Sequence, residues 1–164
     1  MARYSVGFAN VTPVAVAATT NYTDAGYPTF IQGASSTSRL VVGEIYMGGE
    51  EASASSVNRM IFARDSTVAA TGISGNTLAA LGGSTVAPGS LPVYGSTSTT
   101  KPQRSSTLSL LNLAFNAYGG LVRWVAAPGF EISIVGNTAS LGEASLSSAS
   151  GTGKVSGHVL LEIE

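Results

Sequence analysis

The chain has 164 residues, enough for one domain that buries roughly 70% of its unfolded surface. Only 10% of its residues are charged, against about 25% in an ordinary soluble domain. The net charge is −1 and the Lys and Arg residues are scattered, so no basic face predicts binding to nucleic acid. Because so weakly charged a surface gives little repulsion between copies, the composition favours self-association.

The sequence contains no cysteine, which excludes disulfides, thiolate nucleophiles and metal sites built on cysteine. The opening residues, MARYSVGFANVTPVAV, lack the basic start and unbroken apolar block of a signal peptide. No run of about 20 apolar residues predicts a membrane span. We therefore expect synthesis in a cytoplasm and no membrane partner.

The first third of the chain predicts short strands. Residues 3–10 alternate, with Tyr4, Val6 and Phe8 on one side. Pro13 limits the next residues to an edge strand or a turn, because proline has no hydrogen-bond donor for a sheet. Residues 1–35 are therefore expected to be an extended N-terminal segment that makes contacts. Further extended pieces are expected at 14–20, 28–32, 39–47 and 57–63.

The longest irregular region spans residues 65–104 and is rich in Gly, Pro, Ser and Thr. Within it, Thr77–Leu81 could form one helical turn with Asn76 as its cap. A loop this long inside a compact domain is usually functional or ordered by its neighbours. It is expected to be either the main contact arm or a flexible insertion.

Residues 107–134 are the predicted structural centre, with two apolar strands joined by a hairpin turn at Gly119–Gly120. Leu111, Leu113 and Phe115 fall on one side at period two. The same stretch also has apolar residues at helical spacing, so a helix is the rival interpretation. The shortness of the run and the glycine pair favour strands.

The rest of the chain predicts two more strands. Pro128–Gly129 marks a turn, after which Phe130, Ile132 and Ile134 alternate with polar residues in a half-buried strand. Residues 154–164 show the cleanest alternation, which places a terminal strand with a mostly polar outer face against the core. About eight short strands and no convincing long helix predict one all-β domain over residues 1–164, an antiparallel sandwich or barrel.

No pattern in the sequence predicts a reaction centre. His158 is the only histidine; a catalytic triad would need it with Asp24 or Asp65, and no Gly-x-Ser-x-Gly elbow presents a serine. The stretch Gly151–Lys154 lacks phosphate-loop spacing. We expect no enzyme, no catalytic residue, no metal site and no cofactor. A glycosidase would need two carboxylates on either side of the bond that it cleaves. The candidates for such a pair are Glu44, Glu50, Glu51, Glu131 and Glu143.

Tyr118, Arg123 and Trp124 are the candidate interface residues. Trp124 beside a turn is an ordinary core or hairpin filler. Together with Arg123 and Tyr118 it also matches the residue types enriched at binding hot spots. Both interpretations stay open from the sequence.

The order of these features resembles small jelly-roll virion proteins of tailed bacteriophages, which serve as head decoration, cement or other virion structural proteins. The combination of Ala114–Asn116, Gly120, Trp124, Pro128 and Glu131–Ile132 is its most telling part. Because the surface is rich in Ser and Thr, the resemblance does not decide whether the chain is a cement, a shell or a tail protein. The matching stretches are YSVGFANVT, VVGEIYMGGEEAS, VNRMIFAR, LAFNAYGG, RWVAAPGFEI and GHVLLEIE.

The resemblance implies a single antiparallel jelly-roll β-sandwich with a long insertion. It also implies a capsid decoration or cement protein, commonly a trimer, that binds the major capsid protein and bridges capsomers on the virion surface. The alternative is a carbohydrate-binding jelly roll of a phage fibre or a lectin. That alternative would need aromatic platforms or a calcium cluster, and Asp24 and Asp65 are the only aspartates.

Overall fold

A computed structural model describes residues 2–18, 20–22, 27–33, 37, 39–52, 57–67, 76–82, 93–95, 100–136, 141–151 and 153–164. These residues form eleven strands and no helix, which confirms the all-β prediction. The strands are β1 (Ala2–Val11), β2 (Thr29–Gln32), β3 (Arg39–Glu50), β4 (Val57–Thr67), β5 (Thr77–Leu81), β6 (Val93–Gly95), β7 (Gln103–Asn116), β8 (Tyr118–Val125), β9 (Ile132–Val135), β10 (Glu143–Ser150) and β11 (Val155–Ile163).

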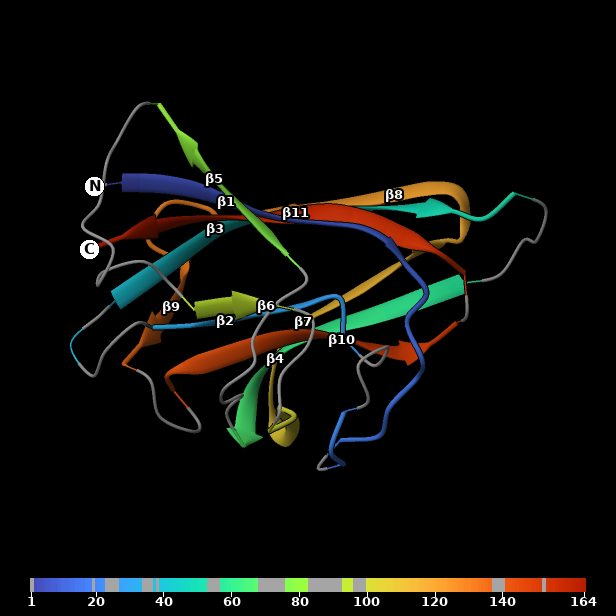
Figure 1. The fold of residues 1–164 in the computed structure, drawn as a ribbon, viewed down its shortest axis with the longest axis horizontal. Coiled ribbons are helices and arrows are strands. Elements are labelled where there is room, and N and C mark those ends of the chain that lie inside the picture. Colours follow the sequence, from blue (N-terminus) through green and yellow to red (C-terminus); the bar gives the residue numbers. More distant parts are fainter. Residues whose placement is uncertain are drawn as a thin grey trace.

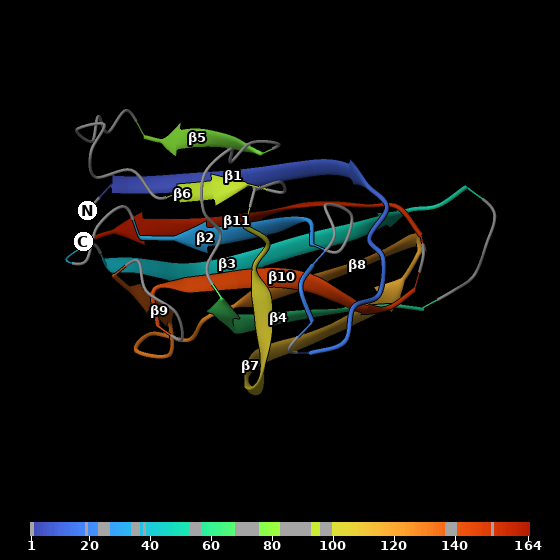
Figure 2. The ribbon, with the colours of Figure 1, turned by 60° about the horizontal axis from the view of Figure 1, so that its bottom comes forward.

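The strands form two antiparallel sheets that lie one above the other (Figure 1). Sheet A has the order β5-β1-β11-β3-β8, with β9 also pairing with β3. Sheet B has the order β6-β2-β10-β4-β7. Consecutive strands therefore often lie in different sheets. In the turned view, β1, β11 and β3 run side by side across the molecule (Figure 2).

The core between the sheets is built by the alternation that the sequence predicts. In β1, Tyr4, Val6 and Phe8 are buried, and Val159 and Leu161 of β11 lie in the same apolar cluster. Since β-strand side chains alternate between faces, the intervening residues of both strands face away from the core. Sheet B closes the cluster with Ile31, Met60, Phe62, Leu113, Phe115, Ala144 and Leu146.

The predicted hairpin at Gly119–Gly120 is wrong, because β7 and β8 belong to different sheets. The chain crosses the sandwich at Ala117, which is fully buried. Gly119 has a φ of +66°, which favours glycine. At Gly120 a Cβ atom would lie 2.6 Å from both N and O of Asn116, so the crossing leaves no room for a side chain.

Other predictions in irregular regions also need correction. Thr77–Leu81 is a strand paired with β1, not a helical turn, and Asn76 donates its Nδ2 to the Pro28 carbonyl instead of capping a helix. The edge of β1 offers this segment backbone partners that one helical turn cannot provide. Phe130 precedes β9 and is 78% exposed, since the turn at Gly129 leads the chain away from the sheet.

Several strands differ from their sequence-based positions. The described residues between 14 and 20 form no strand, whereas residues 143–150 form β10. Of the predicted loop at 65–104, residues 65–67, 76–82, 93–95 and 100–104 are described and include the end of β4, β5, β6 and the start of β7. The remainder of that loop lies outside the described residues.

We expect Gly120→Ala to lower the free energy of unfolding by about 1–3 kcal/mol, because the methyl group overlaps backbone atoms at the crossing. Gly43→Ala is the matched control: a Cβ atom there meets nothing within 4 Å, so its effect should stay within about 0.5 kcal/mol. Urea unfolding followed by circular dichroism measures both. Equal effects of the two substitutions would contradict this account of the crossing.

Candidate functional site

The outer face of sheet A carries cross-strand ion pairs. Arg3 Nε donates to Glu162 Oε1 at 2.5 Å, joining β1 to β11. Arg123 of β8 binds Glu44 of β3 through two hydrogen bonds of 2.9 Å. The side chains of both arginines are more than half exposed, so each pair adds little stability but fixes the position of a charge. A third pair joins Arg39 to Glu164, with 2.8 Å between Nη1 and Oε2.

An aromatic pair lies beside the Arg123–Glu44 ion pair. The rings of Tyr46 and His158 stack with centroids 5.3 Å apart and planes 14° apart. His158 Nε2 lies 3.9 Å from Glu44 Oε1. Hydrogen bonds from Arg123 lower the pKa of Glu44, against a smaller opposing effect of desolvation. Glu44 therefore stays ionised and is shared by two potential cations.

A hollow of about 740 Å³ lies on the same outer face, across the ends of β1, β11 and β3. Val41, Gly43, Leu160 and Leu81 are its apolar lining. The Arg3–Glu162 and Arg39–Glu164 pairs also line it, as do Gly129 and Glu131 of the loop between β8 and β9. Glu44 is a further charged residue of the lining. The hollow therefore combines apolar residues with two arginines and four glutamates.

The three candidate interface residues do not form one patch. Tyr118, at the start of β8, is 60% exposed. Arg123 points outward to Glu44, whereas the next residue, Trp124, is half-buried against the core cluster. The core interpretation of Trp124 thus fits its position. Sequence reasoning missed Leu121 and Val125, which are 63% and 53% exposed on the same strand and flank Arg123 at period two.

Several polar side chains are buried together on the outer face of sheet B, the face that points away from the core. Ser145 of β10 donates to Asp65 Oδ1 at 2.5 Å, and its hydroxyl lies 3.3 Å from the Tyr22 hydroxyl. Asp65, Glu143 and Ser145 are fully buried, and Arg104 is 5% exposed. We call Tyr22, Asp65, Arg104, Glu143 and Ser145 the buried polar cluster.

Residues 12–18 and 20–22, which we call the strap, cover this cluster. Val16 N donates to the Ser148 carbonyl at 3.0 Å, and Arg104 Nη2 donates to the Val16 carbonyl at 2.8 Å. Tyr22 N donates to the Pro102 carbonyl at 3.2 Å. These residues of the predicted N-terminal arm therefore pack onto the chain's own sheet B.

Burial controls ionisation in the cluster. Desolvation raises the pKa of Asp65 well above its usual value, and the neighbouring charge of Glu143 raises it further. Burial also raises the pKa of the Tyr22 phenol to about 12, with Asp65 adding to the effect. The sequence signal that could have revealed the cluster is the alternation of Glu143 and Ser145 with the apolar Ala144.

Of the weighed glycosidase carboxylates, Glu44 and Glu131 line the hollow on sheet A, and Glu143 lies in the buried polar cluster. The structure separates the groups weighed for a catalytic triad. His158 lies on the outer face of sheet A and Asp65 beneath the strap on sheet B, while Asp24 is outside the described residues. Within the described part of the chain, no three His, Cys, Asp or Glu side chains gather closely enough to hold a metal ion. The same part contains no helix with the length and apolar character needed to cross a membrane.

Comparison with known proteins gave no relative: no family model, curated protein or solved structure matches the chain.

We expect the free energy of unfolding to fall as pH rises from about 4, the pKa of an unfolded aspartate. The folded state holds the Asp65 proton more tightly than the unfolded state does, so its contribution to stability is lost as pH rises toward the folded pKa. Asp65→Asn should remove this fall and be more stable than the wild type near neutral pH. Urea unfolding at a series of pH values measures it.

Glu44→Gln is the control with the opposite sign. The folded pKa of Glu44 is lowered, so its stabilisation is present above the unfolded pKa of about 4.3 and is lost on acidification. This variant should keep the fall toward neutral pH. A wild-type slope in Asp65→Asn would contradict the role given to Asp65.

Proposed function

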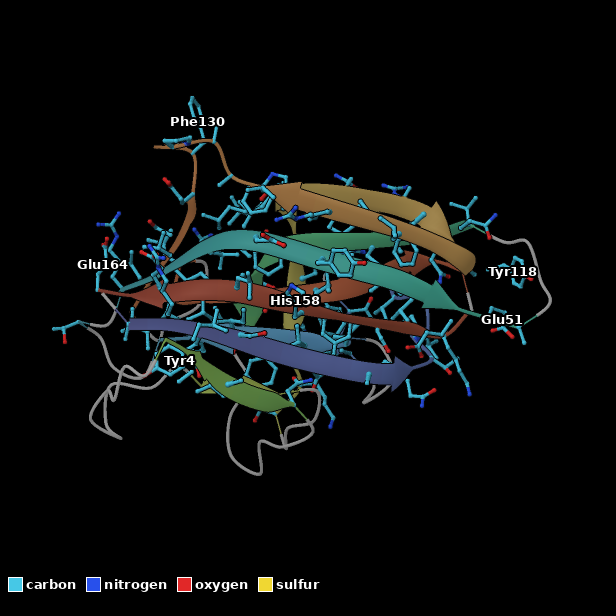
Figure 3. All side chains as sticks on the ribbon, turned by 90° about the horizontal axis from the view of Figure 1, so that it is seen from above. Tyr4, Glu51, Tyr118, Phe130, His158 and Glu164 are labelled. Carbon is cyan, nitrogen blue, oxygen red and sulfur yellow. The ribbon has the colours of Figure 1, made fainter. Side chains whose placement is uncertain are left out.

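We propose that this chain is a virion structural protein, a capsid decoration or cement protein of a tailed bacteriophage. It associates with copies of itself as a trimer, binds the major capsid protein and bridges capsomers on the head surface. The observation that carries the proposal is the exposed apolar edge of sheet A. We call Tyr118, Leu121 and Val125, which all lie on β8, the apolar edge; each is at least 53% exposed. Phe130, in the loop after β8, lies apart from Tyr118, toward the other end of the molecule (Figure 3).

The finer fold that we propose is a jelly roll, a sandwich of two four-stranded sheets made from two Greek keys. Its support is the strand order β1-β11-β3-β8 in one sheet and β2-β10-β4-β7 in the other. The chain passes repeatedly between the sheets, and its first and last strands are neighbours. On this assignment β5, β6 and β9 are short additions.

The apolar edge supports contact with other chains for two reasons. Three large, water-exposed apolar side chains lie on one strand, and apolar residues exposed on this scale are found at interaction sites. In addition, β8 is the last strand in the order of sheet A, and an edge strand offers unpaired backbone groups to a partner. The low charge of the chain, 10% of its residues, removes the repulsion that would keep such edges apart.

The difference between the two outer faces indicates which side makes the contact. The strap covers the outer face of sheet B around Ser145 and Ser148. The outer face of sheet A carries exposed arginines and the hollow. We assign contact with the shell and with neighbouring copies to sheet A and its β8 edge, where many modest contacts add through multivalency.

Carbohydrate binding is the second candidate, and one observation favours it. The stacked Tyr46 and His158 rings line a shallow hollow of about 410 Å³ together with Phe8 and Glu50. An aromatic ring beside a carboxylate can hold a sugar by stacking and hydrogen bonds. Glycan binding that is lost in Tyr46→Ala, without loss of shell binding, would support this candidate.

We expect the purified protein to cosediment with capsid shells assembled from the major capsid protein of the same phage, and to reach saturation. Leu121→Asp should weaken this binding by about tenfold or more, because it places a charge at the centre of the apolar edge. Val14→Asp is the matched control, since Val14 is 51% exposed on the strap over sheet B. Absence of shell binding by the wild type would contradict the proposed function.

A further inference from the structure

The buried polar cluster contains a row of ionisable side chains that crosses three strands of sheet B. Asp65 of β4 lies opposite Arg104 of β7. On the other side of β4, Ala144 of β10 lies opposite Arg64, so the next residues, Glu143 and Asp65, meet across the two strands. Two carboxyls and one guanidinium are neutral together only when one of the carboxyls holds a proton.

The guanidinium of Arg104 gives its hydrogen bond to the strap and not to the two acids. Its Nη2 donates to the Val16 carbonyl, while its Nε and Nη1 have no hydrogen-bond partner among the described residues. Asp65 receives its hydrogen bond from a neutral donor, the hydroxyl of Ser145. Two ionised carboxylates side by side in this dry site are therefore poorly compensated, since a buried charge needs donors and a like charge opposes it.

The elements around the pair supply few other groups that titrate. The Asp65–Glu143 pair holds the only carboxyls among the described residues of the strap, β2, β4, β7 and β10. Burial raises the pKa of the Tyr22 phenol to about 12, and Arg64 points inward, where it donates to a carbonyl of β9. The other charged or titratable groups with described side chains are Tyr27 before β2, Arg59, which is six residues or about 20 Å from Asp65 along β4, and Lys101 before β7.

The strap is the element that can yield to a charge at the pair. After β1 the chain leaves sheet A and crosses to sheet B, where the described strap residues form no strand (Figure 1). Pro13 and Tyr22 are buried, and the other described residues of the strap are exposed or half-buried. β10, by contrast, is bonded on its two sides to β2 and β4. Segments with few buried contacts open locally while the rest of the fold stays intact.

We propose that the strap is a latch controlled by one proton: it lies closed over the Asp65–Glu143 pair while the pair holds a proton, and it lifts when that proton is lost. Lifting the strap brings water to both carboxylates and to the unpartnered nitrogens of Arg104. The latch is a property of the chain itself and does not depend on the capsid role proposed above.

The latch opens toward higher pH. With the strap closed, desolvation raises the pKa of Asp65, and the charge of Glu143 raises it further. With the strap lifted, the carboxyl titrates near its ordinary value of about 4. Between these two values opening releases one proton, so each pH unit makes opening up to about tenfold more favourable.

Amide hydrogen exchange measured by NMR on the full chain tests the latch. Protection factors, which compare each amide with an unstructured peptide at the same pH, are recorded from about pH 5 to pH 8. The amides of Val16 and Tyr22 donate to carbonyls outside the strap and report its opening. The amides of β11, which has a partner strand on each side, report the core. The protection factors of the strap should be at least about 100-fold lower than those of β11 and should fall by up to about tenfold per pH unit.

Variants of the pair separate the proton from the rest of the contact. Asp65→Asn keeps an oxygen that accepts from Ser145 but has no proton to lose, so its strap protection should not change with pH and should exceed that of the wild type at about pH 8. Glu143→Gln is the second variant; it removes the like charge and should reduce the total fall by about tenfold. Glu44→Gln, on the outer face of sheet A, is the matched control and should keep the wild-type slope.

The outcomes decide the proposal in either direction. Strap protection that stays constant with pH in the wild type would overturn the latch, since no proton would then control it. Equal protection factors at the strap and at β11 would overturn it as well, because the opening would then be global unfolding. A wild-type slope in both Asp65→Asn and Glu143→Gln would show that another group controls the strap, and the proposal would fail.

Discussion

β10 is buried on both of its faces, and the rest of the molecule is arranged around that constraint. Ala144 and Leu146 face the core, while Glu143 and Ser145 face the strap. A buried polar group that lacks a partner costs roughly 1–3 kcal/mol, and a buried charge costs more. The hydrogen bond from Ser145 to Asp65 is therefore a condition for this strand to lie where it does.

This constraint makes the two outer faces of the sandwich different. The strap crosses sheet B over the buried polar cluster and is held there by the hydrogen bond that Arg104 donates to the Val16 carbonyl. On the outer face of sheet A, polar side chains such as Arg123 and Glu44 pair with one another across strands at the surface. The polar groups of sheet B are thus buried under the strap, whereas those of sheet A are paired at the surface.

The sequence predicts the strands that have one buried and one exposed face. β1, β3 and β11 are predictable because their apolar residues recur at period two. β10 is not, because its two buried faces use small and polar residues. Of the candidate site, Arg123 is identified by residue type, but its partner Glu44 comes from another strand and only tertiary structure brings them together.

Turn signals in the sequence indicate where the chain bends but not which sheet it joins next. Gly119–Gly120 has the sequence pattern of a hairpin, whereas the glycines are needed where the chain crosses between layers. Phe130 has the pattern of a strand residue because the alternation that includes Ile132 extends back to it. The turn at Gly129 ends the sheet pairing before that residue, so the side chain lies in solvent.

The pairing of β1 with β11 places the two ends of the chain side by side. Ala2 lies opposite Ile163, and the N and C labels are neighbours at one end of the sandwich (Figure 1). Arg3 and Glu164 both line the hollow on sheet A. A purification tag or a displayed protein fused at either end would therefore emerge beside this hollow and crowd it. A protein that is to be displayed without covering sheet A should be inserted on the opposite side of the sandwich, in the exposed part of the strap near Val14.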